Sequence, residues 1–183
     1  ALSQVAWALH RDRQGDPAGS RAMLLEAIEP LRADPAAHGR LLVQVLIALE
    51  QQRSLVAEPL GFDPLEEAEA VARAAFGEDS LQLALVRVRR ASSLTNRGEY
   101  AASEQEFLAA IPVLEDRLGP DHGSTLGALN NLGYLYHGQG DLAGAERIHR
   151  ELLERKLALH GPVHRAVGDS YQNLAAALTH QGR

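Results

Sequence analysis

The chain has 183 residues, of which 45% are apolar, 23% are charged and only 4% are aromatic, and its formal net charge is −6. A chain of this length can bury a continuous apolar core, but its acidic balance argues against a surface that follows nucleic-acid phosphates. The one basic cluster, Arg87, Arg89 and Arg90, is too small to change that expectation. The absence of cysteine excludes disulfides, thiolate nucleophiles and cysteine-ligated zinc or iron–sulfur sites.

The apolar runs and the termini predict neither membrane insertion nor secretion. The longest apolar stretch, residues 41–49, is far shorter than the ~20 residues that span a bilayer. Residues 1–7 lack the basic start and apolar core of a signal peptide. We therefore expect a cytoplasmic protein without membrane contact. Because the chain does not begin with methionine and ends inside an expected turn, we also expect a piece of a longer protein.

The apolar residues of the chain favour helices, and from Leu126 to Tyr136 they follow helical spacing. Alanine and leucine supply most of them, and both are strong helix formers. β-branched residues are sparse and never alternate with polar ones, so strands are not expected. The sequence predicts an all-α protein, with helices over residues 1–13, 17–33, 37–54, 64–76, 79–97, 100–118, 121–138, 142–160 and 163–181.

Two interleaved series of glycines show that the chain is built from repeats. Loop signatures beginning at Gly77, Gly119 and Gly161 recur with a 42-residue period, and a second series with the same spacing comprises Gly98, Gly140 and Gly182. Each period predicts a helical hairpin, which gives four hairpins and one unpaired final helix. The second hairpin is irregular, because prolines and a glycine interrupt residues 58–64.

Local residues predict how these hairpins begin and close. Asp79 and Asp121 follow the loop glycines, where a carboxylate can cap the first turn of a helix. Ala101 and Ala143, with Ala102 and Gly144 beside them, recur early in the second helices, where we expect the two helices of a hairpin to approach closely.

Residues 118–140, LGPDHGSTLGALNNLGYLYHGQG, resemble the 42-residue tetratricopeptide repeat of kinesin light chains, a repeat that many bacterial signalling proteins also carry. Gly133, Tyr136 and Ala145 match the small, large and alanine positions of the family pattern, and Ala175 and Leu178 match the first two in the next repeat. The resemblance is close over residues 77–183 and looser over 1–76. It implies one domain over residues 1–183, a right-handed superhelical solenoid of antiparallel hairpins that binds proteins and is not an enzyme.

The chain departs from the family pattern in two places. Gly123 and Arg165 follow the loop histidines, where the family often has proline. Arg87 and Arg90 occupy positions at which neighbouring repeats carry core leucine or tyrosine, so we expect the third repeat to tilt or to expose that stripe.

The search for chemistry predicts no catalytic residue, cofactor site or metal site. There is no phosphate-binding glycine loop followed by lysine, since Lys156 is the only lysine, and there is no GxSxG or HExxH motif. His160 and His164 are close in sequence, but Gly161-Pro162 separates them, so they do not share a helix face. We expect His122 and His164 to cap or pack the starts of hairpins.

The acidic residues of the second helices are expected to face solvent rather than to form a catalytic pair. They are Glu66, Glu67, Glu69, Glu104, Glu106, Glu151 and Glu154.

The stronger candidate for a functional site is the concave inner face, which the first helix of each hairpin is expected to line. An asparagine amide offers both donors and an acceptor, so a ladder of them can hold an extended peptide backbone. The alternative is that Asn131 and Asn173, which are one repeat period apart, bond locally to the backbone of a neighbouring helix and only support packing. The candidate groove residues are Asn130, Asn131, Tyr134, His137, Asp169, Gln172, Asn173 and Thr179, with Leu85, Val88, Ser92 and Thr95 at the corresponding face of residues 79–97.

The leading hypothesis is a scaffold that binds a peptide or partner domain in this groove. The alternative is a regulatory or oligomerisation segment of a multidomain signalling protein, for example one with a kinase or nucleotide-switch domain. A third hypothesis, a self-standing enzyme, has no motif in its favour. The final helix carries an apolar stripe, Leu174, Ala175 and Leu178, which a further repeat or a second copy could cover, so self-association through this helix is a separate expectation.

Overall fold

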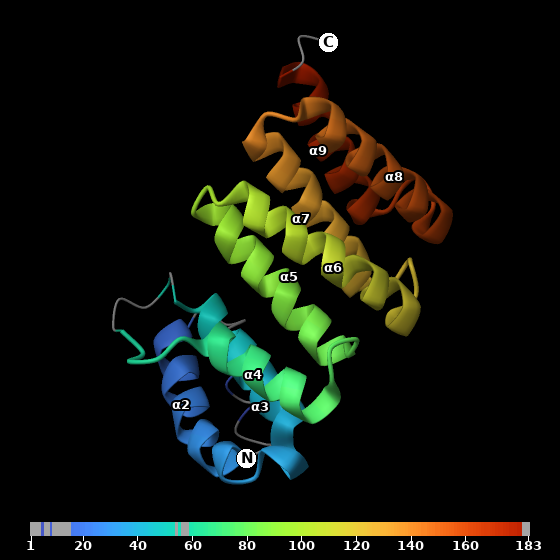
Figure 1. Cartoon of the computed structure of the whole chain (residues 1–183). Coiled ribbons are helices and arrows are strands. Elements are labelled where there is room, and N and C mark those ends of the chain that lie inside the picture. Colours follow the sequence, from blue (N-terminus) through green and yellow to red (C-terminus); the bar gives the residue numbers. More distant parts are fainter. Residues whose placement is uncertain (1–4, 6–7, 9–15, 54, 56–58, 181–183) are drawn as a thin grey trace. The chain divides into compact units, whose positions relative to one another are not determined.

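The computed structural model describes residues 5, 8, 16–53, 55 and 59–180. Within them the fold is all-α, a solenoid of consecutive helices without a strand (Figure 1). None of these helices is long and apolar enough to cross a membrane. The expected helix over residues 1–13 and the turn at Gly182 fall almost entirely outside the described residues.

The helix boundaries confirm the sequence prediction to within three residues. The helices are α2 (Pro17–Ala33), α3 (Pro35–Gln51), α4 (Pro64–Phe76), α5 (Leu81–Asn96), α6 (Tyr100–Leu118), α7 (Gly123–Gln139), α8 (Leu142–His160) and α9 (Arg165–His180).

The largest difference is at α3, which both begins and ends earlier than the sequence predicts. Its early start has a local cause. Asp34 accepts a hydrogen bond from the Ala37 amide (3.0 Å), and Pro35 fills the first helical position, where no amide hydrogen is needed.

The chain divides into two compact units, residues 1–89 and 90–183. In the first unit α3 packs against both α2 and α4. In the second, α7 packs against α6 and α8, and α8 packs against α9, in the order expected of stacked hairpins (Figure 1). Large apolar side chains fill the core of each unit, among them Leu24, Leu42 and Leu46 in the first and Phe107, Leu135 and Leu152 in the second.

The glycine series sets the turns, as the repeat predicts. Every described member of both series has a positive φ, from 75° at Gly161 to 96° at Gly119. Residues other than glycine rarely tolerate this left-handed backbone, so these positions end one helix and lead into the next.

The capping residues differ from the prediction at two turns. Asp79 and Asp121 are not the caps. Ser80 accepts the Leu83 amide (3.2 Å) at the start of α5, and His122 accepts the Ser124 amide through Nδ1 (3.1 Å) at the start of α7. Both helices begin two residues later than expected, so the cap falls on the residue after the aspartate.

His164 accepts the Ala166 amide through its Nδ1 (3.2 Å) at the start of α9, in the same way as His122 does at α7. The expectation that these two loop histidines cap the starts of hairpins is therefore confirmed.

The position of close approach within a hairpin also differs from the prediction. Ala101 and Ala143 are exposed, whereas Ser103 and Ala145, each two residues further on, are fully buried. The second helix therefore turns this later residue toward its partner. The expectation is wrong for the two alanines because residues two apart on a helix lie on different faces. It holds for Gly144, which is buried and where an added Cβ would lie 3.2 Å from Tyr136 Cγ of α7.

Some acidic side chains of the second helices form structural bonds, which corrects the expectation that they face solvent. Glu67 on α4 accepts two hydrogen bonds from Arg32 on α2 (2.7 and 2.6 Å), and these bonds raise the Arg32 pKa. Glu104 on α6 accepts the Tyr136 hydroxyl of α7 at 2.8 Å. These carboxylates therefore join neighbouring helices, because side chains of the adjacent helix reach the edge of the solvent face.

The remaining acidic residues of that set divide into two groups. Glu66 and Glu154 are exposed, as expected. The partly buried ones are Glu69, Glu106 and Glu151.

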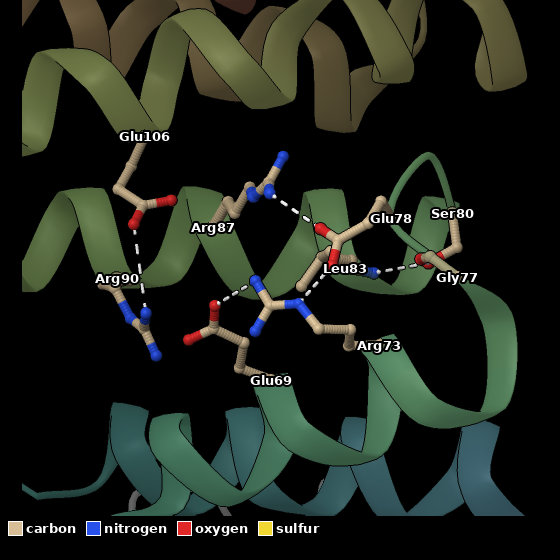
Figure 2. A network of polar contacts seen from close by, with 9 residues as sticks. All are labelled: Glu69, Arg73, Gly77, Glu78, Ser80, Leu83, Arg87, Arg90 and Glu106. Atoms are coloured by element: carbon tan, nitrogen blue, oxygen red, sulfur yellow. Dashed lines mark hydrogen bonds and ion pairs between the residues drawn. The ribbon is translucent and has the colours of Figure 1, made fainter.

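Arg87 and Arg90 of α5 have carboxylate partners and are only half-exposed, so they do not form the fully exposed stripe that was one of the two expected outcomes. Arg87 is half-buried and pairs with Glu78 (3.4 Å), which also pairs with Arg73 beside the α4–α5 turn (Figure 2). Arg90, also half-buried, lies 3.9 Å from Glu106 on α6. Carboxylates at these positions thus compensate for arginine at sites where other repeats place apolar residues.

The apolar stripe expected on α9 is largely covered. Leu174 is buried and Leu178 is partly buried, both against apolar residues of α8. Only Ala175 of the three is exposed. The expectation of an uncovered stripe is therefore wrong for Leu174 and holds only in part for Leu178, because α8 already occupies that side of α9.

The cap assignments can be tested with a matched pair of aspartates. Asp141 accepts the Gly144 amide at the start of α8 (2.9 Å), so Asp141→Ala should lower the free energy of unfolding by ~1 kcal/mol. Asp121→Ala should change it by less than ~0.5 kcal/mol, because His122 caps α7. Urea unfolding followed by circular dichroism measures both; equal losses would contradict the assignment.

Candidate functional site

A groove of about 580 Å³ lies between α7 and α9, over the C-terminal half of α8. Its walls come from two first helices that occupy the same place in successive repeats, and its side chains are mostly polar. The lining residues are Gly123, Leu126, Gly127, Asn130, Tyr134, Lys156, His160, Ala166, Asp169, Gln172 and Asn173.

Five of the eight predicted groove residues line this cavity: Asn130, Tyr134, Asp169, Gln172 and Asn173. They come together because a 42-residue period turns the same face of α7 and α9 in one direction.

The second helix also contributes to the groove, which the sequence analysis missed. Lys156 and His160 of α8 are among the lining residues. The prediction assigned the inner face to first helices alone, whereas the end of α8 reaches between them.

The other three predicted residues do not line the groove. Asn131 is half-buried and donates to the Ser92 hydroxyl of α5 (3.1 Å). Thr179 donates to the Ala175 carbonyl of its own helix (2.8 Å). His137 is half-buried near the C-terminal end of α7.

The asparagines at equivalent repeat positions make equivalent contacts. Asn131 on α7 contacts Ser92 on α5, the first helix of the preceding hairpin. In the same way, Asn173 on α9 accepts a hydrogen bond from the Tyr134 hydroxyl on α7 (3.0 Å). The two residues of each pair are 39 positions apart in the sequence. Asn173 also donates to Asn130 Oδ1 (2.9 Å). These amides therefore bond to side chains of a neighbouring helix rather than to its backbone, and the bonds hold first helices together.

Several polar groups in the groove have no protein partner among the described residues. The Asn130 amide accepts one bond, but neither of its N–H groups donates one. Gln172 makes no side-chain hydrogen bond there, and Lys156 and Asp169 form no ion pair. The groove thus offers donors and acceptors that an incoming molecule could use.

Behind the groove lies a buried histidine that the sequence analysis did not single out. His149 on α8 is only 3% exposed, and its ring packs directly on Gly133 of α7: a Cβ at that glycine would lie 2.7 Å from His149 Cε1. The repeat pattern could have identified position 149 as a buried aromatic site, because Phe107 lies one 42-residue period earlier in the sequence and is fully buried. The small residue at position 133 is therefore required by the close approach of α7 and α8.

Burial is the main reason that the pKa of His149 lies below its ordinary value of 6.5, and the positive charge of His137 and Lys156 adds to the effect. His149 is consequently neutral at neutral pH.

His160, which lines the groove, contacts a second histidine. His160 and His164 stack face to face, with ring centroids 4.3 Å apart. No cluster of three or more potential metal ligands occurs in the part of the chain that the structure describes.

The family model that describes the tetratricopeptide repeat matches residues 82–158 and 124–183. No curated protein sequence matches the chain. Among solved structures, BtubC (BKLC) from P. vanneervenii is similar, with a TM-score of 0.74, 19% identity, and coverage of 99% of this chain and 73% of that one.

A Podosopora anserina protein named as a kinesin light chain with nearly identical TPR-like repeats is also similar. Its TM-score is 0.71 at 15% identity, covering 99% of this chain and 86% of that one, and a point variant of the same protein gives 0.72. At such identities the likeness to these structures shows the shared fold alone.

The contact between Gly133 and His149 predicts opposite effects for two glycine substitutions on α7. Gly133→Ala places a methyl group against the buried imidazole and should destabilise the protein by ~1–3 kcal/mol. Gly127→Ala, where an added Cβ meets nothing within 4 Å, should stabilise it by ~0.5–1 kcal/mol through helix propensity. Chemical denaturation of both variants measures these changes in the free energy of unfolding. Stabilisation by Gly133→Ala would contradict the tight contact between Gly133 and His149.

The lowered pKa of His149 predicts an acid-sensitive stability. As the pH falls below 6.5, the unfolded chain binds a proton at this position while the folded chain does not, so the free energy of unfolding decreases until the folded-state pKa is passed. His149→Phe, which places there the residue found at position 107, should remove this component. The free energy of unfolding of the wild-type chain and of His149→Phe, each measured against pH, gives the contribution of His149 as the difference between the two curves. Parallel curves between pH 7 and pH 5 would exclude the effect.

Proposed function

The chain belongs to the tetratricopeptide repeat family, and we propose that it is a protein-interaction scaffold whose groove between α7 and α9 binds an extended segment of a partner protein. Tetratricopeptide repeat domains generally bind protein partners, and proteins of this kind are typically non-catalytic. The proposed setting is the cytoplasm.

The observation that carries this proposal is the set of unpartnered polar groups along one groove. The Asn130 N–H groups, the Gln172 amide and the Asp169 carboxylate face a shared cavity and make no bond within the described residues that would satisfy them. An extended backbone presents a C=O and an N–H at regular intervals, which are the complements of a side-chain amide. The groove is therefore suited to hold main chain.

Tyr134 supplies the apolar area that affinity requires. The residue is 49% exposed while its hydroxyl is held by Asn173, so the side chain is oriented before a partner arrives. An oriented aromatic ring loses little conformational entropy on binding, and tyrosine is enriched among the residues that dominate binding energy. We infer that Tyr134 is the anchor of the site.

A matched pair of tyrosines tests the proposal. Tyr171 on α9 is exposed to nearly the same extent as Tyr134 (52%) but does not line the groove. Peptides selected on the wild-type chain from a phage-displayed random library should lose about tenfold or more in affinity for Tyr134→Ala, which corresponds to ~1.4 kcal/mol or more. They should bind Tyr171→Ala with unchanged affinity.

Asparagines provide a second comparison in the same assay. Asn130→Ala should weaken peptide binding, whereas Asn131→Ala should affect stability alone, because Asn131 bonds to Ser92 outside the groove. Equal losses for Tyr134→Ala and Tyr171→Ala would place the binding surface elsewhere on the chain. A library that yields no binder to the folded wild-type chain would contradict the proposal of an extended ligand.

A further inference from the structure

The groove and the buried histidine beneath it are physically connected. The Tyr134 ring meets the His149 ring edge to face, with centroids 5.8 Å apart and planes inclined by 69°. From the other end of the same side chain, the Tyr134 hydroxyl donates to Asn173 Oδ1, and Asn173 donates to Asn130 Oδ1. One series of contacts therefore runs from the core between α7 and α8 to the open groove.

The space around His149 leaves its ring little freedom. The Cε1, Nε2 and Nδ1 atoms would lie 2.7, 2.9 and 3.2 Å from a Cβ at Gly133, so the imidazole covers that glycine closely. No hydrogen bond from the His149 ring is present among the described residues. The ring is therefore held by packing alone, in a position that suits a neutral aromatic side chain, as at the equivalent Phe107.

We propose that His149 is a positioning residue of the groove: its neutral ring holds Tyr134 in place for Asn173 and Asn130, and its protonation releases this arrangement, so that the groove is acid-sensitive. The proposal deepens the function proposed above, on which its biological meaning rests, and concerns the regulation of the same site. No partner is needed for the structural coupling itself.

Electrostatics around the ring favour the neutral form. The groups that face His149 are Tyr134 and His137 on α7 and Lys156 on α8, and both His137 and Lys156 lower its pKa. Asp169 on α9 lines the groove but does not contribute to the shift in the His149 pKa. A proton on this ring would therefore have little access to water and no carboxylate partner among the described residues, and the charged ring is stabilised by leaving its contact with Gly133 and Tyr134.

The direction of the effect follows from this linkage. Well above pH 6.5 the imidazole is neutral in folded and unfolded chains alike, and the groove keeps its bonded form. Below that value a proton binds with increasing free-energy gain in any conformation that exposes the ring, so the population with a displaced Tyr134 grows. Binding of a partner that requires the ordered groove would weaken in parallel.

Side-chain NMR of the full 183-residue chain tests the coupling without a ligand. The amide resonances of Asn173 and Asn130 should shift between pH 7.5 and pH 5 with the same midpoint as the His149 Cε1–H resonance. In His149→Phe these shifts should vanish while the signals keep their neutral-pH positions. Persistence of the shifts in His149→Phe, or their absence while His149 titrates, would overturn the proposal.

Two further variants sharpen the result. His137→Gln is a matched control that removes one of the two positive neighbours and should move the common midpoint upward without abolishing it. Tyr134→Phe keeps the ring against His149 but lacks the hydroxyl, so Asn173 should lose its pH response while His149 still titrates; this variant decides the question even if His149→Phe does not fold.

The coupling and the binding function can fail independently. Peptide binding at Tyr134 with no pH response at Asn173 would reject the role of His149 alone. A shared titration together with unchanged affinity in Tyr134→Ala would reject the groove as the binding surface while leaving the coupling intact.

Discussion

The equal register of successive repeats is the constraint on which the rest of the structure depends. From α4 to α8 each helix is followed by a glycine in a left-handed conformation, and these glycines form two series with the same 42-residue period. Because a helix rotates by a fixed angle per residue, equal spacing turns the same face of α7 and α9 toward one groove. A change in the spacing would rotate Asn173 away from Tyr134 and separate the polar groups that the groove collects.

Close packing between α7 and α8 adds the second requirement. Gly133 leaves room for an aromatic ring at position 149, where the preceding repeat has Phe107. A histidine there packs much as a phenylalanine does while it is neutral, but it carries a titratable nitrogen into the core. The same site can therefore serve packing and sensitivity to acid, because the ring shape is kept and only its charge changes.

Polar side chains join helices in both units, each considered by itself. Arg32 on α2 donates to Glu67 on α4, and Arg155 on α8 donates to Glu115 on α6 at 3.0 Å. In each case an arginine bridges the second helices of successive hairpins. Partial burial lets these pairs hold their geometry better than exposed ion pairs. Acidic residues that the helical pattern places toward solvent thus connect neighbouring repeats.

From residue 17 onward the sequence by itself determined the helices, their boundaries to within three residues, the turn glycines and the stacking of hairpins. These features depend on local propensity and on a period that is visible in the residue order. The sequence also assigned Asn130, Tyr134 and Asn173 to one face. Only the tertiary structure decided that Asn131 bonds to Ser92, that Lys156 and His160 enter the groove, and that His149 lies behind Tyr134. Those facts depend on which side chains meet across neighbouring helices, and a periodic pattern gives the facing surfaces but not the individual contacts between them.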